Sequence, residues 1–279
     1  MSSVPPLVVA MILGAALLHA TWNALLKSGL DRLWSITLMC AVAAVASGIA
    51  VFFVPLPAAA AWGCAVFSAI LQIGYCLFLV RAYDKGELGQ VYPIARGSAP
   101  LLVALGGAVF AHEQLSVPAI AGLALLSGGI ITLGRGRDRL DRATARDAVV
   151  AGAFIAAYMV TDGIGVRLAG NAFSYVAWMT LLQGAPMPLV YLAIRRRLPP
   201  LRLEPETLKA LGGGVLGLAA YAVVVWAMSL APLAKVSGLR ETSILFAAVL
   251  GALFLGERFT LRKAACALAI TAGALLLAF

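Results

Sequence analysis

Long apolar runs recur along the whole chain, and short segments with charged residues separate them. A helix needs about 20 apolar residues to cross the roughly 30 Å hydrocarbon core of a bilayer. The runs predict ten membrane-spanning helices near residues 7–26, 33–53, 61–80, 88–110, 117–133, 147–168, 173–194, 210–229, 234–255 and 262–279. The first run lacks a basic leader and an evident cleavage site, so we expect a span rather than a signal peptide.

Composition agrees with an all-α membrane protein. Hydrophobic residues make up 62% of the 279 positions and charged residues 12%, whereas a soluble domain carries about 25% charge. The connecting segments are too short to hold a soluble domain. Prolines in or near the predicted spans are expected to kink a helix or end it early; they are Pro93, Pro100, Pro186 and Pro188.

The ninth predicted span repeats the fourth. At an offset of 144 residues, KVSGLRETSILFAAVLGALFLGE aligns with VYPIARGSAPLLVALGGAVFAHE. Arg96 then aligns with Arg240, and Glu113 with Glu257. The chain therefore divides into a first five-helix repeat at 1–134, a basic cytoplasmic linker at 135–146 and a second five-helix repeat at 147–279.

Five spans per repeat have a topological consequence. Because five is odd, the second repeat must enter the membrane in the opposite orientation to the first. Inverted repeats of this kind are a common transporter architecture, with the substrate site near mid-depth between the repeats. We therefore predict a five-plus-five inverted repeat around a central cavity.

The positive charge gathers in alternate loops. Of the 21 lysines and arginines, 17 lie in the odd-numbered loops. Positive loops stay cytoplasmic, so both termini are predicted to be periplasmic in a bacterial inner membrane. The net charge of +9 is thus explained by orientation and lipid contact, and we expect no nucleic-acid partner. The 17 are Lys27, Arg32, Arg81, Lys85, Arg135, Arg137, Arg139, Arg142, Arg146, Arg195, Arg196, Arg197, Arg202, Lys209, Arg258, Arg262 and Lys263.

Four charged residues inside spans are candidate substrate-binding residues: Arg96, Asp162, Arg240 and Glu241. Ionisable groups within a bilayer are costly and usually functional, but they also pair with one another. Either the arginines receive a substrate carboxylate, which their planar fork matches at two points, or the four form interhelical locks such as Arg240 with Asp162. Both arrangements could hold in different conformations.

Other polar and aromatic residues could line the cavity or simply pack. The candidates are His19, Trp22, Asn23, Tyr75, Tyr92, Tyr158, Tyr221 and Trp226. Tyr175 and Trp178 instead fit the aromatic belt at a membrane interface. The four cysteines lie in apolar runs without metal-binding spacing, which indicates packing. Glu113 and Glu257 are interpreted as structural loop residues, beside Ser116 and Thr260 as helix caps.

Motifs for nucleotide hydrolysis, zinc proteolysis and serine hydrolysis do not occur in the sequence. We predict no cofactor, no metal site and no enzymatic activity. Two alternatives of another class stay open: an intramembrane enzyme that uses Asp162 and Glu241, and a structural subunit of a membrane complex.

The loops after spans four and nine carry a family resemblance. Gly256-Glu257-Arg258-Phe259-Thr260, and less closely Ala111 to Ser116, resemble the recurrent loop of the EamA branch of the drug/metabolite transporter superfamily. The resemblance implies export of amino acids or similar small metabolites from a cavity lined chiefly by spans three, four, eight and nine, with contributions from spans one and six. Many relatives carry cytoplasmic termini, so the loop charges of this chain predict the reverse orientation.

These observations together predict a secondary transporter, acting by alternating access as its two halves rock around a central site. Export of cationic or drug-like solutes, with Asp162 and Glu241 as counter-charges, is the alternative within this class. We expect a monomer, and the sequence leaves an oligomer open.

Overall fold

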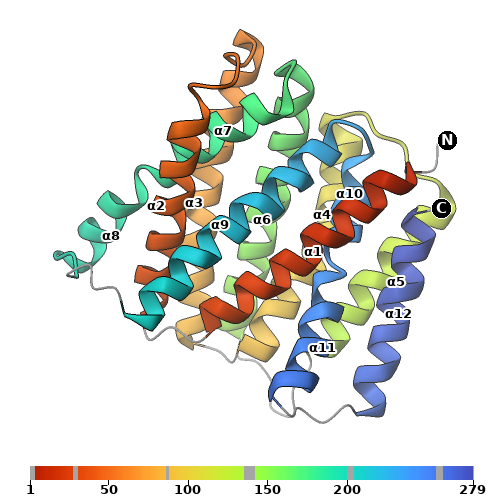
Figure 1. Cartoon of the computed structure of the whole chain (residues 1–279). Coiled ribbons are helices and arrows are strands. Elements are labelled where there is room, and N and C mark those ends of the chain that lie inside the picture. Colours follow the sequence, from red (N-terminus) through yellow and green to blue (C-terminus); the bar gives the residue numbers. More distant parts are fainter. Residues whose placement is uncertain are drawn as a thin grey trace.

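The computed structural model describes residues 4–27, 31–85, 88–134, 142–199, 204–255 and 260–278. Every regular element within these ranges is helical (Figure 1). The helices are α1 (Pro6–Lys27), α2 (Arg32–Ala50), the short η1 (Ala59–Ala61), α3 (Trp62–Lys85), α4 (Leu88–Phe110), α5 (Val117–Leu133), α6 (Arg142–Leu168), α7 (Ala172–Gly184), α8 (Met187–Arg195), α9 (Pro205–Met228), α10 (Leu233–Arg240), α11 (Ser243–Leu255) and α12 (Leu261–Ala278).

These helices match the ten predicted spans and confirm the all-α fold. Eight segments of the described chain are long and apolar enough to cross a membrane, and α5 is a shorter apolar helix. The seventh span is divided into α7 and α8, and the ninth into α10 and α11. Both termini lie at the same end of the bundle (Figure 1), as an even number of crossings requires.

The two breaks have different causes. Pro186 and Pro188 stand where α7 gives way to α8, as the sequence predicted. Pro93 and Pro100, by contrast, lie inside the continuous α4, so of the two effects expected of prolines in a span, they do not end the helix. The break between α10 and α11 contains no proline. Its backbone hydrogen bonds join residues three positions apart, as in the bond from the Ile244 amide to the Glu241 carbonyl oxygen at 3.1 Å.

Equivalent helices of the two repeats begin with equivalent caps. Asp31 caps α2 by accepting from the Trp34 amide at 3.1 Å, and Asn171 caps α7 by accepting from the Ser174 amide at 3.0 Å. The predicted caps Ser116 and Thr260 accept from backbone amides in the first turns of α5 and α12. Such bonds satisfy backbone donors that a helix leaves open at its start.

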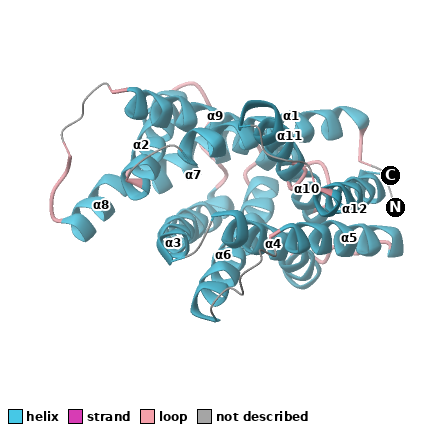
Figure 2. Ribbon diagram, turned by 90° about the horizontal axis from the view of Figure 1, so that it is seen from below, coloured by secondary structure: helices cyan, strands magenta, loops and turns pink. Residues whose placement is uncertain are grey.

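Helices of the two repeats interleave. The most extensive packing joins α3 to α6, α5 to α12, α4 to α6, and α1 to α9, so each pair takes one helix from each repeat. Seen along the bundle, α2, α9 and α1 lie on one side and α3, α6, α4 and α5 on the other (Figure 2). We call these the α1–α9 side and the α3–α6 side.

Glycines allow the closest of these approaches. A Cβ atom on Gly122 of α5 would lie 2.8 Å from the Gly273 carbonyl oxygen of α12, and one on Gly214 of α9 would lie 2.7 Å from the Met39 carbonyl oxygen of α2. Side chains at these positions would separate the helix backbones, since small residues permit close helix packing in membranes.

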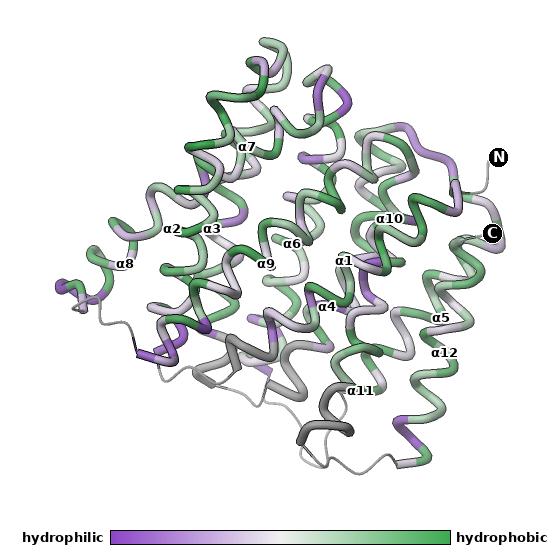
Figure 3. The backbone as a smooth tube through the Cα atoms, viewed as in Figure 1, coloured by the Kyte–Doolittle hydropathy of each residue, from purple (hydrophilic) through white to green (hydrophobic). Residues whose placement is uncertain are grey.

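Apolar side chains also cover the outside of the bundle. Figure 3 shows hydrophobic residues along the length of the helices, with many hydrophilic ones near helix ends. Leu105, Phe110 and Leu268 are each more than 60% exposed. A soluble protein rarely exposes large apolar patches, so this surface is suited to contact with lipid.

Candidate functional site

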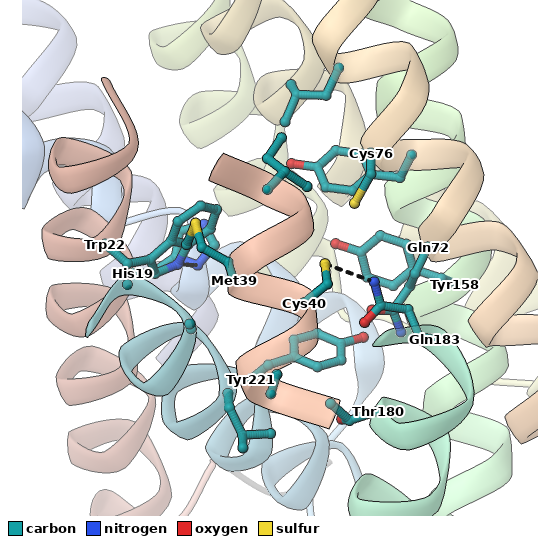
Figure 4. Close-up of a pocket in the computed structure, with 18 of the residues that line it drawn as sticks. His19, Trp22, Met39, Cys40, Gln72, Cys76, Tyr158, Thr180, Gln183 and Tyr221 are labelled. Carbon is teal, nitrogen blue, oxygen red and sulfur yellow. Dashed lines mark hydrogen bonds between the residues drawn. The ribbon is translucent and has the colours of Figure 1, made fainter. Parts of the chain in front are cut away.

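A cavity of about 150 Å³ lies between the α1–α9 side and the α3–α6 side (Figure 4). Its lining residues come from the second half of α1, the first half and middle of α2, the middle parts of α3 and α9, and from α6, α7 and α10. They include His19, Trp22, Met39, Cys40, Gln72, Tyr75, Cys76, Tyr158, Thr180, Gln183, Gly213, Gly217, Tyr221 and Arg240. The end of the bundle where α1 and α3 finish is called the odd-loop end, and the opposite end the even-loop end. The cavity therefore lies near mid-depth, and its α1 and α2 residues extend it toward the odd-loop end.

Arg240 is the one permanently charged residue among those that line the cavity. It ends α10 and is 3% exposed. Its guanidinium lies 5.7 Å from the centre of the Tyr221 ring, and its Nη1 atom lies 3.2 Å from the Met159 sulfur. The ring face attracts the cation, while no carboxylate in the described part of the chain lies within ion-pair distance of it. This arrangement suits an incoming anion.

Four aromatic side chains, Trp22, Tyr75, Tyr158 and Tyr221, line the cavity together with Arg240. Tyr158 contacts Tyr75 and Tyr221 edge to face, with ring centres 5.8 and 5.9 Å apart. Trp22 donates its indole hydrogen to His19 Nδ1 at 3.0 Å, which fixes that ring pair at the cavity edge. Such rings offer apolar area with a few polar atoms, as small-molecule sites commonly do.

Asp162 lies behind this wall and is fully buried. Its Oδ1 atom accepts from the Tyr175 hydroxyl at 2.8 Å. Its Oδ2 atom accepts from the Tyr221 hydroxyl and from Gln72 Nε2, the latter at 3.3 Å. The three donors stand on α7, α9 and α3. One carboxylate of α6 thus joins both sides of the cavity.

Arg96 and Glu241 form an ion pair away from the cavity lining. The Arg96 Nε atom lies 2.7 Å from Glu241 Oε2, and both side chains are almost completely buried, at 1% and 0% exposure. Arg96 also donates to the Ser243 hydroxyl at 3.4 Å. The pair joins α4 to the break between α10 and α11. Among the locks considered from sequence, the structure therefore contains Arg96 with Glu241, and Asp162 bonds to neutral donors rather than to Arg240.

The even-loop end is held by a second network around Glu113 and Arg167. Arg167 Nη2 lies 2.7 Å from Glu113 Oε1, and the guanidinium also donates to the carbonyl oxygens of Met228 and Ala231 at 3.0 Å. Glu113 Oε2 accepts from the Leu233 amide at 2.8 Å. Glu113 thus satisfies a backbone donor, as predicted for a structural residue, but the donor belongs to α10 rather than to the adjacent α5. We call these contacts the even-end clamp.

The structure brings half of the predicted substrate-binding residues together around the cavity. His19, Trp22, Tyr75, Tyr158, Tyr221 and Arg240 line it. Asp162 bonds to two lining residues. Asn23 donates to the His19 carbonyl oxygen, and Trp226 packs against the apolar core. Arg96 and Glu241 are occupied by each other. Tyr92 stands on α4, and its side chain lies outside the described residues, as does the loop residue Glu257.

Sequence reasoning missed several contributors. Gln72, Thr180 and Gln183 line the cavity, together with Cys40 and Cys76. Gln183 Nε2 donates to the Cys40 sulfur at 3.2 Å. Amides within an apolar span were the available signal, since a polar side chain there needs a partner. The membrane-belt interpretation of Tyr175 is wrong, because its side chain is 0% exposed and bonds to Asp162.

Comparisons with known proteins agree with this architecture. No curated protein shows significant similarity to the sequence. A solved structure described as "Crystal structure of protein" superimposes with a TM-score of 0.77 at 19% identity, over 96% of this chain and 95% of that one. At this identity the likeness shows the fold alone. The model of the EamA-like transporter family matches residues 6–135 and again residues 148–279. Since the two matches cover nearly the whole chain, the protein belongs to the EamA-like transporter family.

Proposed function

We propose that this membrane transporter exports amino acids or similar small carboxylate-bearing metabolites. The observation that carries the proposal is Arg240, a buried guanidinium on the wall of a central cavity with no described carboxylate against it. A guanidinium offers a planar pair of donors that matches a carboxylate. A cavity of about 150 Å³ is smaller than the roughly 300–1,000 Å³ of drug-sized sites, which favours a small solute.

The cavity walls supply the rest of an amino-acid site. Tyr75, Tyr158 and Tyr221 present rings beside Arg240, which can contact an apolar side chain or an ammonium group. Gly213 and Gly217 leave space for a solute beside α9, because a glycine places no side chain in the cavity.

The position of the cavity supports alternating access. The cavity extends from mid-depth toward the odd-loop end, while the even-end clamp joins the α4–α5 loop to α6, α9 and α10 at the other end. We propose that the clamp opens and the odd-loop end closes when the transporter delivers its substrate. Because α1 packs with α9 and α3 with α6, the moving bodies would each contain helices of both repeats.

The direction of export rests on orientation. With the basic loops in the cytoplasm, as the positive-inside rule predicts, the cavity would load from the cytoplasm and both termini would be periplasmic. A cysteine introduced beside Arg196 should then be protected from an impermeant thiol reagent on whole cells, and one beside Gly170 should react. The reverse labelling pattern would place the cavity toward the outside.

A flux assay tests the proposed function. Purified protein in liposomes should exchange radiolabelled amino acids from a panel that includes alanine, leucine, phenylalanine and glutamate, whereas protein-free liposomes should not. Uptake of tetraphenylphosphonium or another organic cation in place of amino acids would support the cationic alternative. The burial of Glu241 against Arg96 and the presence of Arg240 in the cavity argue against that alternative, since a cationic solute would be repelled.

A further inference from the structure

Asp162 is unusual among the charged residues inside the bundle, because its neighbours are neutral. Arg96 and Glu241 neutralise each other, but Asp162 is bonded to two tyrosine hydroxyls and an amide. A buried carboxylate without a cationic partner is costly in a membrane. Three donors reduce this cost, and a bound proton would remove the charge altogether.

The surrounding groups define what Asp162 can bind. From the described helices packed against α6, the titratable or charged side chains that face this region are Cys64 of α3, Tyr175 of α7, Tyr221 of α9 and, beyond the Tyr221 ring, Arg240 of α10. On α4, Arg96 is occupied by Glu241, and η1 consists of alanines only. The Tyr221 ring thus stands between Arg240 and Asp162.

The geometry favours a proton over a metal cation. Sodium and similar cations need a shell of oxygen ligands, but Tyr175, Tyr221 and Gln72 all direct hydrogens at the carboxylate. These donors would have to turn away before a metal could enter. The described residues also contain no group of three His, Cys, Asp or Glu side chains that could hold a metal ion.

A proton has a short route to the carboxylate. Tyr221 and Gln72 both line the cavity and both donate to Asp162 Oδ2. A proton from cavity water would form an O–H bond at Oδ2, and the water that supplied it would keep the electron pair. The protonated oxygen becomes a donor, so at least one of its two present donors must turn away or present an acceptor oxygen instead.

That change would act between the two sides of the bundle. Tyr221 belongs to α9 and Asp162 to α6, so their bond crosses the cavity from the α1–α9 side to the α3–α6 side. The Tyr221 ring also lies beside Arg240. Loss of the Tyr221 bond would therefore free a residue next to the proposed carboxylate site.

We propose that Asp162 is the proton-binding residue that couples transport to a pH gradient. The proposal rests on the proposed transport function. It adds a second ligand, the proton, at a site separated from Arg240 by the Tyr221 ring. Occupation by a proton would loosen the contact between the two sides of the cavity, and release of the proton would restore it.

Infrared difference spectroscopy tests proton binding without any substrate. When the purified protein is acidified, a carbonyl band of a buried carboxylic acid should appear, and it should shift in protein labelled with carbon-13 aspartate. The band should be lost in Asp162→Asn and kept in the double variant Arg96→Leu/Glu241→Leu and in the surface control Glu206→Gln. Should Asp162→Asn fail to fold, Asp162→Glu decides: its band should no longer shift with the aspartate label, whereas a band from the other buried aspartate, Asp147, would still shift. A wild-type band without the label shift, a band that persists in Asp162→Asn, or no band would overturn the proposal.

A flux experiment tests the coupling. In liposomes with wild-type protein, a pH gradient should drive leucine accumulation, and Asp162→Asn should lose this accumulation while leucine counterflow without a gradient stays measurable. Accumulation that follows a sodium gradient instead, or that persists in Asp162→Asn, would overturn the proposal. If wild-type protein shows counterflow but no response to pH, the proton proposal fails and the transport function stands. If it shows no counterflow of any amino acid in the panel, the transport function itself fails.

Discussion

Arg96 and Arg240 occupy the same position in the two repeats, yet their surroundings differ. Arg96 is sealed in an ion pair with Glu241, at 2.7 Å. Arg240 lies on the cavity wall, against the Tyr221 ring and the Met159 sulfur. The first arginine joins two helices, and the second is placed to receive a ligand. A repeated sequence position therefore does not imply a repeated role.

The neighbouring residue explains the difference. Glu241 follows Arg240, whereas the equivalent residue after Arg96 is Gly97. A Cβ atom on Gly97 would lie 2.7 Å from an Ile131 side-chain carbon, so α5 leaves no room for a second glutamate. The two arginines therefore have one glutamate between them, and this glutamate pairs with Arg96. The asymmetry leaves a cation at the cavity.

Removal of the Glu241 charge should have the largest effect. Glu241→Gln leaves Arg96 buried without its counter-charge, and breaking a buried pair this way costs on the order of 3–5 kcal/mol. We expect a large drop in thermal stability in detergent. The double variant Arg96→Leu/Glu241→Leu should recover much of it, because apolar replacement of a buried pair is often neutral. A single variant as stable as wild type would contradict the assigned role of this pair.

Removal of the Arg240 charge should affect transport instead. Arg240→Gln should weaken leucine binding by about 1.5–3 kcal/mol, roughly tenfold to a hundredfold, since a hydrogen bond to a charged group is lost. Leucinamide lacks the carboxylate, so its affinity for wild type and for the variant should be nearly equal. Competition binding with both compounds measures the contrast. An equal loss of affinity for leucine and leucinamide would show that Arg240 does not bind the carboxylate.

Weakening the even-end clamp should have a smaller effect. The Arg167 side chain is 33% exposed, so we expect Arg167→Gln to cost about 1 kcal/mol, or roughly a fivefold shift in population toward the open even-loop end. A cysteine at Ser68, which is fully buried, should then react faster with an impermeant thiol reagent added from that end. The experiment requires a background without the native cysteines.

Arg146 provides the matched control for the clamp. It also pairs with a carboxylate, Asp147, at 3.2 Å, but its side chain is 70% exposed and lies at the odd-loop end. Arg146→Gln should leave the Ser68→Cys labelling rate unchanged. Equal rates in wild type and Arg167→Gln would mean that the clamp does not hold the even-loop end.

The fold was largely predictable because span length and repeat offset depend on local sequence. Runs of apolar residues determine the spans, and caps such as Asp31 and Ser116 begin them. The break after Arg240 was not predictable, since it contains neither proline nor glycine. It occurs where Glu241 meets Arg96, a residue 145 positions earlier in the chain, and only tertiary packing brings the two together.

The candidate site was less predictable than the fold, for a similar reason. A buried tyrosine and a membrane-belt tyrosine look alike in sequence. Only the bond of Tyr175 to Asp162, which the folded structure provides, identifies Tyr175 as buried. The roles of Arg96 and Arg240 could not be distinguished either, because the two residues occupy equivalent positions in the repeats. Which of two equivalent arginines faces the cavity depends on a partner that the other repeat supplies.

Direct binding to matched lysine variants tests the central claim, that Arg240 and not Arg96 receives the substrate carboxylate. A lysine keeps the charge but not the planar fork. Binding of leucine and thermal stability should be measured side by side in wild type, Arg96→Lys and Arg240→Lys. Arg240→Lys should lose affinity with near-normal stability, and Arg96→Lys should lose stability with near-normal affinity. Unchanged affinity in a folded Arg240→Lys variant would contradict the account.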